Sequence, residues 1–280
     1  MLDFAMPADV PLLSSCEASE RAACTRLFFD VDDTLTWRGR LPEEAVRSLY
    51  RAKDAGLSLV AVTGRSFAWG EMLVRMFPLD AVVAETGAMA LWWHGTSLES
   101  LFHEPEESER VRLAHLRATA TKTVLARVKT ARLARDNVGR VCDTAFDLVE
   151  EGDAVSVDDA ARIRSILVEG GLAVAQSSVH INAFAFGKHG PFDKATMVDR
   201  LLQRSASTSL SAAAPALCYV GDSTNDGPLF AAAGLSVGVG NVSASLPLLR
   251  ERGQAPRFVV DGNGGFGFSQ VVNALLEVRD

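Results

Sequence analysis

Two acidic residues follow a short apolar segment near the start of the chain. Residues 27–31 form an apolar run that leads into Asp30-Val31-Asp32-Asp33-Thr34. Because Asp30 and Asp32 lie two residues apart, extended backbone points both side chains to the same side. Such a pair could bind a hard cation through oxygen, or one carboxylate could attack phosphorus while the other moves a proton. A solvated acidic turn would show the same pattern, so the pair alone leaves both interpretations open.

Two further polar positions stand at the starts of predicted helices. Thr63-Gly64-Arg65 follows the apolar residues 57–62. A hydroxyl and backbone N–H groups at a helix start suit a phosphate oxygen, although Ser and Thr are also common helix caps. Arg65 is a candidate for a second phosphate contact, against the alternative of a surface charge. Lys194 begins another predicted helix, a position that is usually a solvated charge when taken alone.

A second acidic segment, Gly221-Asp222-Ser223-Thr224-Asn225-Asp226, comes directly after the apolar residues 217–220. Asp222 and Asp226 lie one helical turn apart and can therefore face one site. Acids at a strand end can also be capping residues, but this combination after an apolar strand is fairly specific.

The elements that must position these residues alternate between strands and helices. Strands are predicted at residues 27–31, 57–62, 81–84, 217–220 and 236–239, with helices opening at Pro42 and spanning 67–76, 194–203 and 226–233. This rhythm predicts a parallel sheet with helices on both faces. We therefore expect an α/β protein whose Rossmann-like parallel-sheet core, residues 25–98 and 187–280, is interrupted by an inserted α+β unit at 99–186. Residues 1–24 are expected to form a loose leader, and 205–215 a polar loop.

The insert is predicted to hold helices at 104–135 and 158–169 and strands at 145–150, 172–176 and 179–186. Acids and bases are mixed along the first helix, which favours a solvated surface over a nucleic-acid surface. Ser178, His180 and Asn182 alternate with apolar residues, so they share one face of a strand. That face is either the solvent side of a sheet or a surface that touches substrate, where His180 could bind sugar hydroxyls.

Composition limits the partners. The 280 residues carry a formal net charge of -7, which argues weakly against nucleic acid or an anionic membrane as main partner. No apolar window approaches the length of a membrane span, and the start lacks the features of a secretory signal. The four cysteines form no C-x-x-C pair, so we expect reduced thiols and a cytoplasmic location.

A glycine-rich segment near the end, residues 262–267, fits the pattern G-x-G-x-x-G. No βαβ unit or ribose-binding acid can follow it within the remaining residues, so we interpret it as a loop at the start of the last helix rather than a dinucleotide site.

Taken together, these pieces make the sequence resemble the haloacid dehalogenase-like phosphatase superfamily, over nearly the whole chain after Thr25. Its four motifs are matched in order by residues 30–34, Thr63, Lys194 and residues 221–226. An α+β module between the second and third motifs resembles the type IIB cap, as in the Cof-like and sucrose-phosphatase-like branch. Glu85-Thr86-Gly87-Ala88 resembles that branch's E-N-G-A segment, with Thr in place of Asn.

The resemblance implies a role for each motif residue. Asp30 would be the nucleophile and Asp32 the general acid and base. Mg²⁺ would be held by Asp30, the backbone carbonyl of Asp32 and Asp222, with Asp226 in support. Phosphoryl oxygens would be held by Thr63, Gly64, Lys194 and Asn225. Substrate contacts from Arg65, His180 and Asn182 complete the expected site.

The implied function is Mg²⁺-dependent hydrolysis of a small phosphorylated metabolite, with sugar phosphates the preferred class because related IIB enzymes act on them. A phosphomutase acting on hexose phosphates is the alternative, since phosphomannomutase resembles the same branch. A non-catalytic binding protein on this fold is the third possibility, and the presence of every motif residue argues against it.

Overall fold

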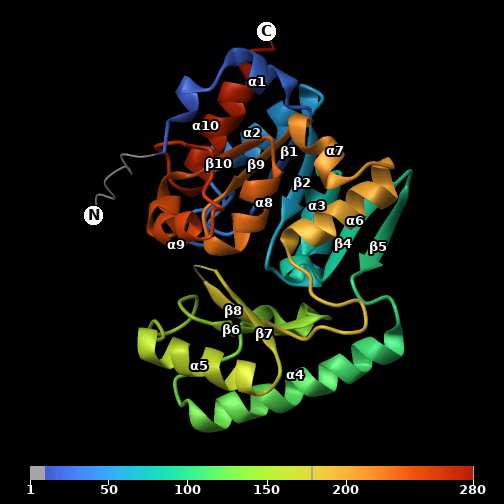
Figure 1. The fold of residues 1–280 in the computed structure, drawn as a ribbon, viewed down its shortest axis with the longest axis vertical. Coiled ribbons are helices and arrows are strands. Elements are labelled where there is room, and N and C mark those ends of the chain that lie inside the picture. The colour runs from blue at the N-terminus through green and yellow to red at the C-terminus, as the bar shows by residue number, and fades with distance from the viewer. Residues whose placement is uncertain (1–9, 178, 280) are drawn as a thin grey trace.

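The computed structural model describes residues 10–177 and 179–279, which form two parts stacked along the long axis (Figure 1). The larger part, here called the core, is built on an eight-stranded sheet with the order β11-β10-β9-β1-β2-β3-β4-β5. The smaller part, here called the cap, is built on a three-stranded sheet with the order β6-β8-β7. The prediction of an α/β core interrupted by an α+β unit is confirmed.

The core sheet is parallel from β11 through β3, and β4 and β5 add an antiparallel hairpin at one edge. Its strands are β1 (Arg26–Phe29), β2 (Ser58–Val62), β3 (Ala81–Ala84), β4 (Met89–His94), β5 (Ser97–Phe102), β9 (Leu217–Gly221), β10 (Leu235–Gly238) and β11 (Phe258–Val259). Because β5 pairs with β4 along its whole length, residues 99–102 belong to the core sheet and not to the insert, where the sequence placed them.

Helices cover both faces of the core sheet. One face packs against α2 (Glu43–Asp54), α3 (Phe67–Met76) and α10 (Gly264–Leu276), and α1 (Ala18–Ala23) contacts α10. The other packs against α6 (Lys194–Ala206), α7 (Leu210–Ala213), α8 (Gly227–Ala232) and α9 (Leu246–Glu251). The apolar strands are buried on both sides, as a parallel sheet between two helical layers requires. The segment predicted as a polar loop at 205–215 instead contains α7.

Residues before β1 are not a loose leader where the structure describes them. Leu12 forms a bridge with Val259, Leu13 and Cys16 are buried against the core, and α1 contacts α10. Burial of these apolar side chains stabilises the segment although it stands outside the β/α rhythm. Cys16, Cys24, Cys142 and Cys218 are all free, so the prediction of unpaired thiols is confirmed.

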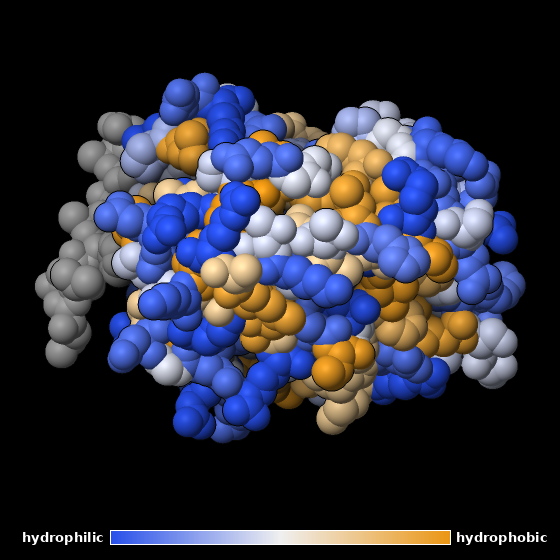
Figure 2. Space-filling view, turned by 90° about the horizontal axis from the view of Figure 1, so that it is seen from below, coloured by the Kyte–Doolittle hydropathy of each residue, from blue (hydrophilic) through white to orange (hydrophobic). Residues whose placement is uncertain are grey.

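The cap presents its sheet to the core and its two helices to the outside (Figure 1). Its elements are β6 (Asp143–Asp147), β7 (Ala173–Gln176), β8 (His180–Phe184), α4 (Glu107–Arg127) and α5 (Val157–Glu169). The helix predicted at 104–135 ends at Arg127, and β6 lies two to three residues earlier than predicted. Seen from below, the molecule shows hydrophilic residues interspersed with small apolar patches (Figure 2). None of the described helices combines the length and the apolar character needed to cross a membrane.

Candidate active site

The carboxyl ends of β1 and β9 lie side by side, because Phe29 pairs with Val220 in the parallel register. Asp30 follows β1 and Asp222 follows β9. Open α/β sheets bind their ligands at this edge. The register therefore brings together two acidic segments that are far apart in the sequence.

Three buried carboxylates meet at this edge: Asp30, Asp222 and Asp226, here called the catalytic cluster. One oxygen of each lies within 4.8 Å of the others, which is close enough to share one metal ion. Lys194 is fully buried among them, with Nζ 2.8 Å from Asp30 Oδ1 and 2.6 Å from Asp226 Oδ1. Three acids and one lysine leave an excess of negative charge that a divalent cation would neutralise.

The pKa values reflect this crowding. Burial raises the pKa of Asp30 to about 7, opposed by the charge of Lys194 and reinforced by that of Asp226. Burial and the charges of Asp226 and Asp30 also raise the pKa of Asp222. Although burial lowers the pKa of Lys194, the charges of Asp226 and Asp30 raise it overall, so the ammonium form persists. A bound cation would favour the ionised carboxylates.

The carboxylates of the cluster differ in what they already bind. Asp226 Oδ1 accepts hydrogen bonds from Lys194 and Tyr219, and Oδ2 accepts the backbone N–H groups of Asp222 and Ser223. Both of its oxygens are therefore engaged in holding the loop together. Among the described residues no hydrogen bond reaches Asp30 Oδ2, which leaves that oxygen available for chemistry.

Two residues that sequence reasoning did not select orient Asp222. Thr34 Oγ1 donates to Asp222 Oδ1 over 3.2 Å, and Asn241 Nδ2 donates to Oδ2 over 3.0 Å. Asn241 Oδ1 also accepts the N–H of Gly264, whose φ is +50°. A Cβ at Gly264 would lie 2.4 Å from the carbonyl oxygen of Thr36. The glycine-rich segment thus packs closely against the loop after β1.

The remaining phosphate-site candidates follow β2 and β9, and one of them contacts the cluster. Asn225 Oδ1 accepts a hydrogen bond from Lys194 Nζ over 3.0 Å. Thr63 is buried, and its Oγ1 accepts the backbone N–H of Arg65 over 3.0 Å. The Gly64 carbonyl accepts hydrogen bonds from two cap residues, Asn182 over 3.1 Å and Arg140 over 2.9 Å.

Arg65 contacts a carboxylate rather than standing free for a phosphate. Its Nε and Nη2 donate to Asp32, with the shortest distance 2.6 Å from Nη2 to Oδ1. Nη2 also lies 2.7 Å from Oε1 of Glu150 in the cap. Among the described residues, no side-chain hydrogen bond joins Arg65 or Asp32 to the catalytic cluster, although Asp30 and Asp32 belong to the same loop.

The face of β8 that carries His180 and Asn182 is buried and not solvated. His180 Nε2 lies 2.7 Å from Glu150 Oε2, and Asn182 Nδ2 donates to Asp143 Oδ2 over 2.7 Å. The third residue predicted on this face, Ser178, lies outside the described residues. The face of β8 with His180 and Asn182 therefore turns toward the core and is not the solvent side of the sheet.

A second group of acids joins cap and core: the buried Glu85 and Asp143 and the half-buried Asp136, here called the seam cluster. Glu85 comes from the core and accepts the backbone N–H groups of residues 141–143 of the cap. Arg140 pairs with both Asp136 and Asp143, each over 2.8 Å. Glu85 and Thr86 have φ values of +49° and +59°, and such left-handed backbone at non-glycine residues is a mark of functional sites.

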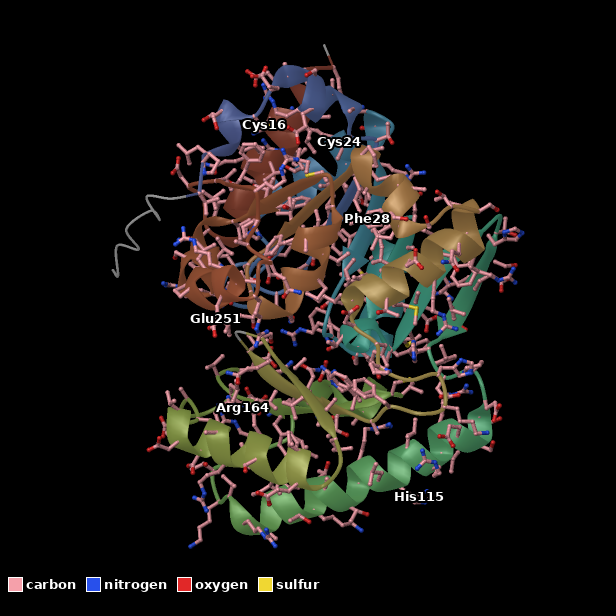
Figure 3. All side chains as sticks on the ribbon, in the orientation of Figure 1. Cys16, Cys24, Phe28, His115, Arg164 and Glu251 are labelled. Atoms are coloured by element: carbon pink, nitrogen blue, oxygen red, sulfur yellow. The ribbon has the colours of Figure 1, made fainter. Side chains whose placement is uncertain are left out.

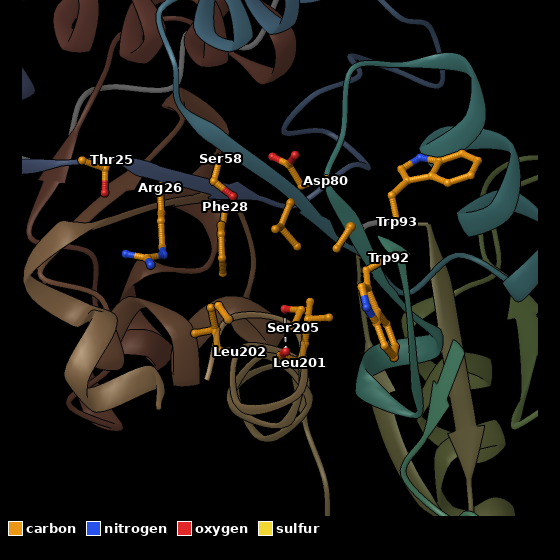
Figure 4. A pocket seen from close by; sticks show the side chains of 13 residues that line it. Thr25, Arg26, Phe28, Ser58, Asp80, Trp92, Trp93, Leu201, Leu202 and Ser205 are labelled. Carbon is orange, nitrogen blue, oxygen red and sulfur yellow. Dashed lines mark hydrogen bonds between the residues drawn. The ribbon is translucent and has the colours of Figure 1, made fainter. Parts of the chain in front are cut away.

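Open space lies on both sides of the catalytic cluster. A cleft of about 780 Å³ between β7 and the loops after β9 and β10 is lined by Asp222, Asn225, Arg164 and Arg252, among others. Figure 3 labels Arg164 on the cap, and Glu251, which precedes Arg252, on the core. A smaller space of about 390 Å³ reaches Lys194 and Thr86. The cavity in Figure 4 lies instead at the amino ends of β1 to β3, away from the acids.

A buried acidic cluster with one lysine, set at the carboxyl edge of a parallel sheet under an inserted cap, defines a phosphohydrolase of the α/β class. Comparison with known proteins agrees. Residues 27–115 match the family model of haloacid dehalogenase-like hydrolases. This match and the relatives named phosphoglycolate phosphatase indicate a phosphatase similar to members of this family.

Relatives cover almost the whole chain. A phosphoglycolate phosphatase of Pyrobaculum aerophilum is 29% identical over 91% of this chain and 96% of its own. The structure of protein 0175 of Thermoplasma acidophilum has a TM-score of 0.66 at 21% identity, covering 91% of this chain and 99% of its own. Sucrose-phosphatase of Synechocystis has a TM-score of 0.57 at 16% identity, covering 89% and 97%.

Proposed function

We propose that the protein is a Mg²⁺-dependent phosphomonoesterase that uses Asp30 as its nucleophile. The observation that carries the proposal is the catalytic cluster around Lys194, in which one oxygen of Asp30 receives no hydrogen bond from the described residues. Oxygen ligands from carboxylates suit Mg²⁺. Asp30 and Asp222 would hold the ion. Asp226 would support the site chiefly through its hydrogen bonds with Lys194 and with the backbone of the loop after β9.

In the first step Asp30 Oδ2 attacks phosphorus, the bond from phosphorus to the ester oxygen breaks, and Asp32 gives its proton to the departing alcohol. In the second step Asp32 takes a proton from water, whose oxygen attacks phosphorus and releases phosphate from Asp30. Lys194, 2.8 Å from Asp30, offsets negative charge throughout, and Thr63, Gly64 and Asn225 border the phosphoryl group. When bound, Mg²⁺ would neutralise charge on the phosphoryl oxygens.

For the substrate we propose a small anionic phosphomonoester, with phosphoglycolate the first candidate. The Pyrobaculum relative carries that activity in its name. Arg140 and Asn182 of the cap contact the Gly64 carbonyl directly, which limits the room for a leaving group above the second motif. Arg164 and Arg252 line the adjoining cleft and could attract a carboxylate. A sugar phosphate is the second candidate, supported by the shared fold with sucrose-phosphatase.

The test is phosphate release by the full chain from phosphoglycolate, hexose phosphates and sucrose phosphate, with Mg²⁺ and with EDTA. We expect release that requires Mg²⁺ and is lost by about 10⁴-fold or more in the folded Asp30→Asn variant. Turnover by Asp30→Asn at the rate of the parent would contradict the nucleophile. Isomerisation of a hexose phosphate without phosphate release would favour a mutase instead.

A further inference from the structure

One arginine joins the proposed acid and base to the cap. Arg65 is 5% exposed, follows the second motif in the core, and holds both oxygens of Asp32 through Nε and Nη2. The same Nη2 lies 2.7 Å from Glu150 Oε1. The guanidinium also stacks over the ring of Trp69, with Cζ 4.9 Å from its centroid. Arg65 is therefore fixed on three sides, and only one of them, Glu150, is contributed by the cap.

The cap holds Glu150 in place with two buried side chains. His180 on β8 contacts Oε2 over 2.7 Å. Asp147, at the end of β6, accepts the backbone N–H groups of residues 149–151 at 2.7 to 3.0 Å. The hydrogen bond with His180, together with the hydrogen bond and charge of Arg65, outweighs burial, which acts in the opposite direction, and brings the pKa of Glu150 down to about 2, so it is an anion at neutral pH. A carboxylate supported in this way presents a fixed charge to the core.

This arrangement has a mechanical consequence. An arginine side chain has several rotatable bonds, and a guanidinium held only at its Asp32 edge could rotate together with that carboxylate. Glu150 restrains the outer edge of the same guanidinium. Because Glu150 belongs to the cap and Arg65 to the core, the restraint exists only while the cap faces the core.

We propose that Glu150 is a positioning residue that, through Arg65, sets the orientation of Asp32 for proton transfer to the leaving alcohol when the cap is closed. The proposal rests on the proposed function, in which Asp32 is the general acid. It makes the proton-transfer geometry depend on the cap, so that substrate is cleaved only in the enclosed state.

The leaving group distinguishes this role from a structural one. An alkyl phosphate releases a strongly basic alkoxide unless a proton is supplied, whereas 4-nitrophenyl phosphate releases a stable phenolate that needs little help. Misplacement of Asp32 should therefore slow the alkyl ester selectively. The ratio kcat/KM is the suitable quantity, because it ends at the first irreversible step and does not include the later hydrolysis of the phosphorylated Asp30.

The experiment compares Glu150→Gln with the parent at saturating Mg²⁺, using the alkyl ester that the parent hydrolyses best and 4-nitrophenyl phosphate. We expect kcat/KM to fall about ten-fold or more for the alkyl ester and by no more than about two-fold for the aryl ester. Glu151→Gln is the matched control, because Glu151 is exposed and pairs at the surface with Arg135. It should leave both values unchanged.

A second variant and a double variant complete the test. Glu150→Asp keeps the charge but shortens the reach, and should show the same selectivity even if Glu150→Gln folds poorly. In the Asp32→Asn background, Glu150→Gln should cost nothing more for the alkyl ester. Equal losses for both esters, or a raised KM with unchanged kcat, would overturn the positioning role. If Asp32→Asn itself showed no preference for the alkyl ester, the proposed acid would fail instead, whatever Glu150 does.

Discussion

The catalytic cluster and the seam cluster each contain three carboxylates and one cationic side chain, but the carboxylates of the two clusters are satisfied in different ways. In the catalytic cluster Lys194 is the only cationic side chain that contacts the acids, within the part of the chain that the structure describes. In the seam cluster Arg140 pairs with two acids, and the third, Glu85, accepts four backbone N–H groups. Backbone donors can satisfy a carboxylate with no ligand present, whereas the catalytic cluster keeps an unmet negative charge.

The two clusters show which property distinguishes a reactive carboxylate from a structural one. Both Asp30 and Glu85 have pKa values raised to about 7, chiefly by burial, so the shift alone does not separate them. What separates them is the number of donors already in place. A carboxylate oxygen without a donor, beside other acids, is prepared for a cation or for nucleophilic attack.

The largest expected effect is on stability at the seam. Glu85→Ala leaves four N–H groups of the cap and core without their acceptor, and should reduce the free energy of unfolding by about 3 to 5 kcal/mol. Urea unfolding of the full chain measures this. Glu71→Ala is the control, since Glu71 pairs with Arg75 at the surface of α3, and the substitution should change stability by less than about 0.5 kcal/mol.

The same measurement on Asp30→Asn sharpens the contrast. With EDTA present at pH 8, removal of this charge relieves repulsion in the catalytic cluster, so stability should stay the same or rise. Equal destabilisation of the Glu85→Ala and Asp30→Asn proteins would mean that the two clusters do not differ as described.

The intermediate effect is the pH dependence of stability. Since the folded protein raises the pKa of Glu85 from 4.5 to about 7, it binds this proton more tightly than the unfolded chain does. The stabilising contribution is thus complete below pH 4.5 and is lost as the pH rises through 7. Relative to Glu85→Gln, the parent should lose roughly 1 to 3 kcal/mol between pH 4.5 and 7.5. Parallel stability curves for the two proteins would contradict this.

The smallest expected effect concerns Thr86. This β-branched residue has a φ of +59°, and its Oγ1 is buried without a partner. Asn tolerates left-handed backbone better. Thr86→Asn should therefore stabilise the protein by about 0.5 to 1 kcal/mol, seen as a rise in the midpoint of thermal unfolding. A lowered midpoint would indicate that the methyl group of Thr86 packs more favourably than the backbone argument allows.

Local patterns predicted a large part of this molecule. The spans of α3 and β3 match the prediction because Pro78, the apolar runs and the loop residues lie next to them in sequence. The acids after β1 and β9 could be placed at one edge because parallel strands share their carboxyl ends. The packing of residues 12–24 could not be predicted because it depends on β11 and α10, which lie at the other end of the chain.

The cap contacts could not be predicted, for the same physical reason. Arg65 carries no sign in the sequence that its partners are Asp32 and Glu150, since these residues are distant in the chain and meet only across two packed parts. Glu85 is paired with backbone N–H groups, which every residue possesses, so no side-chain pattern marks its partners. A sequence shows which charged side chains need a hydrogen-bond partner, but tertiary packing determines which residue provides it.

The place of β1 between β2 and β9 also bears on how the chain folds. Leu27 pairs with Leu59 on one side and with Cys218 on the other. Strands β1 to β5 and the cap can associate soon after synthesis. Pairing of β9 with β1, in contrast, closes a loop that includes the entire cap. Since contacts between distant segments slow folding, we expect the catalytic edge to be assembled last, when Asp222 joins Asp30.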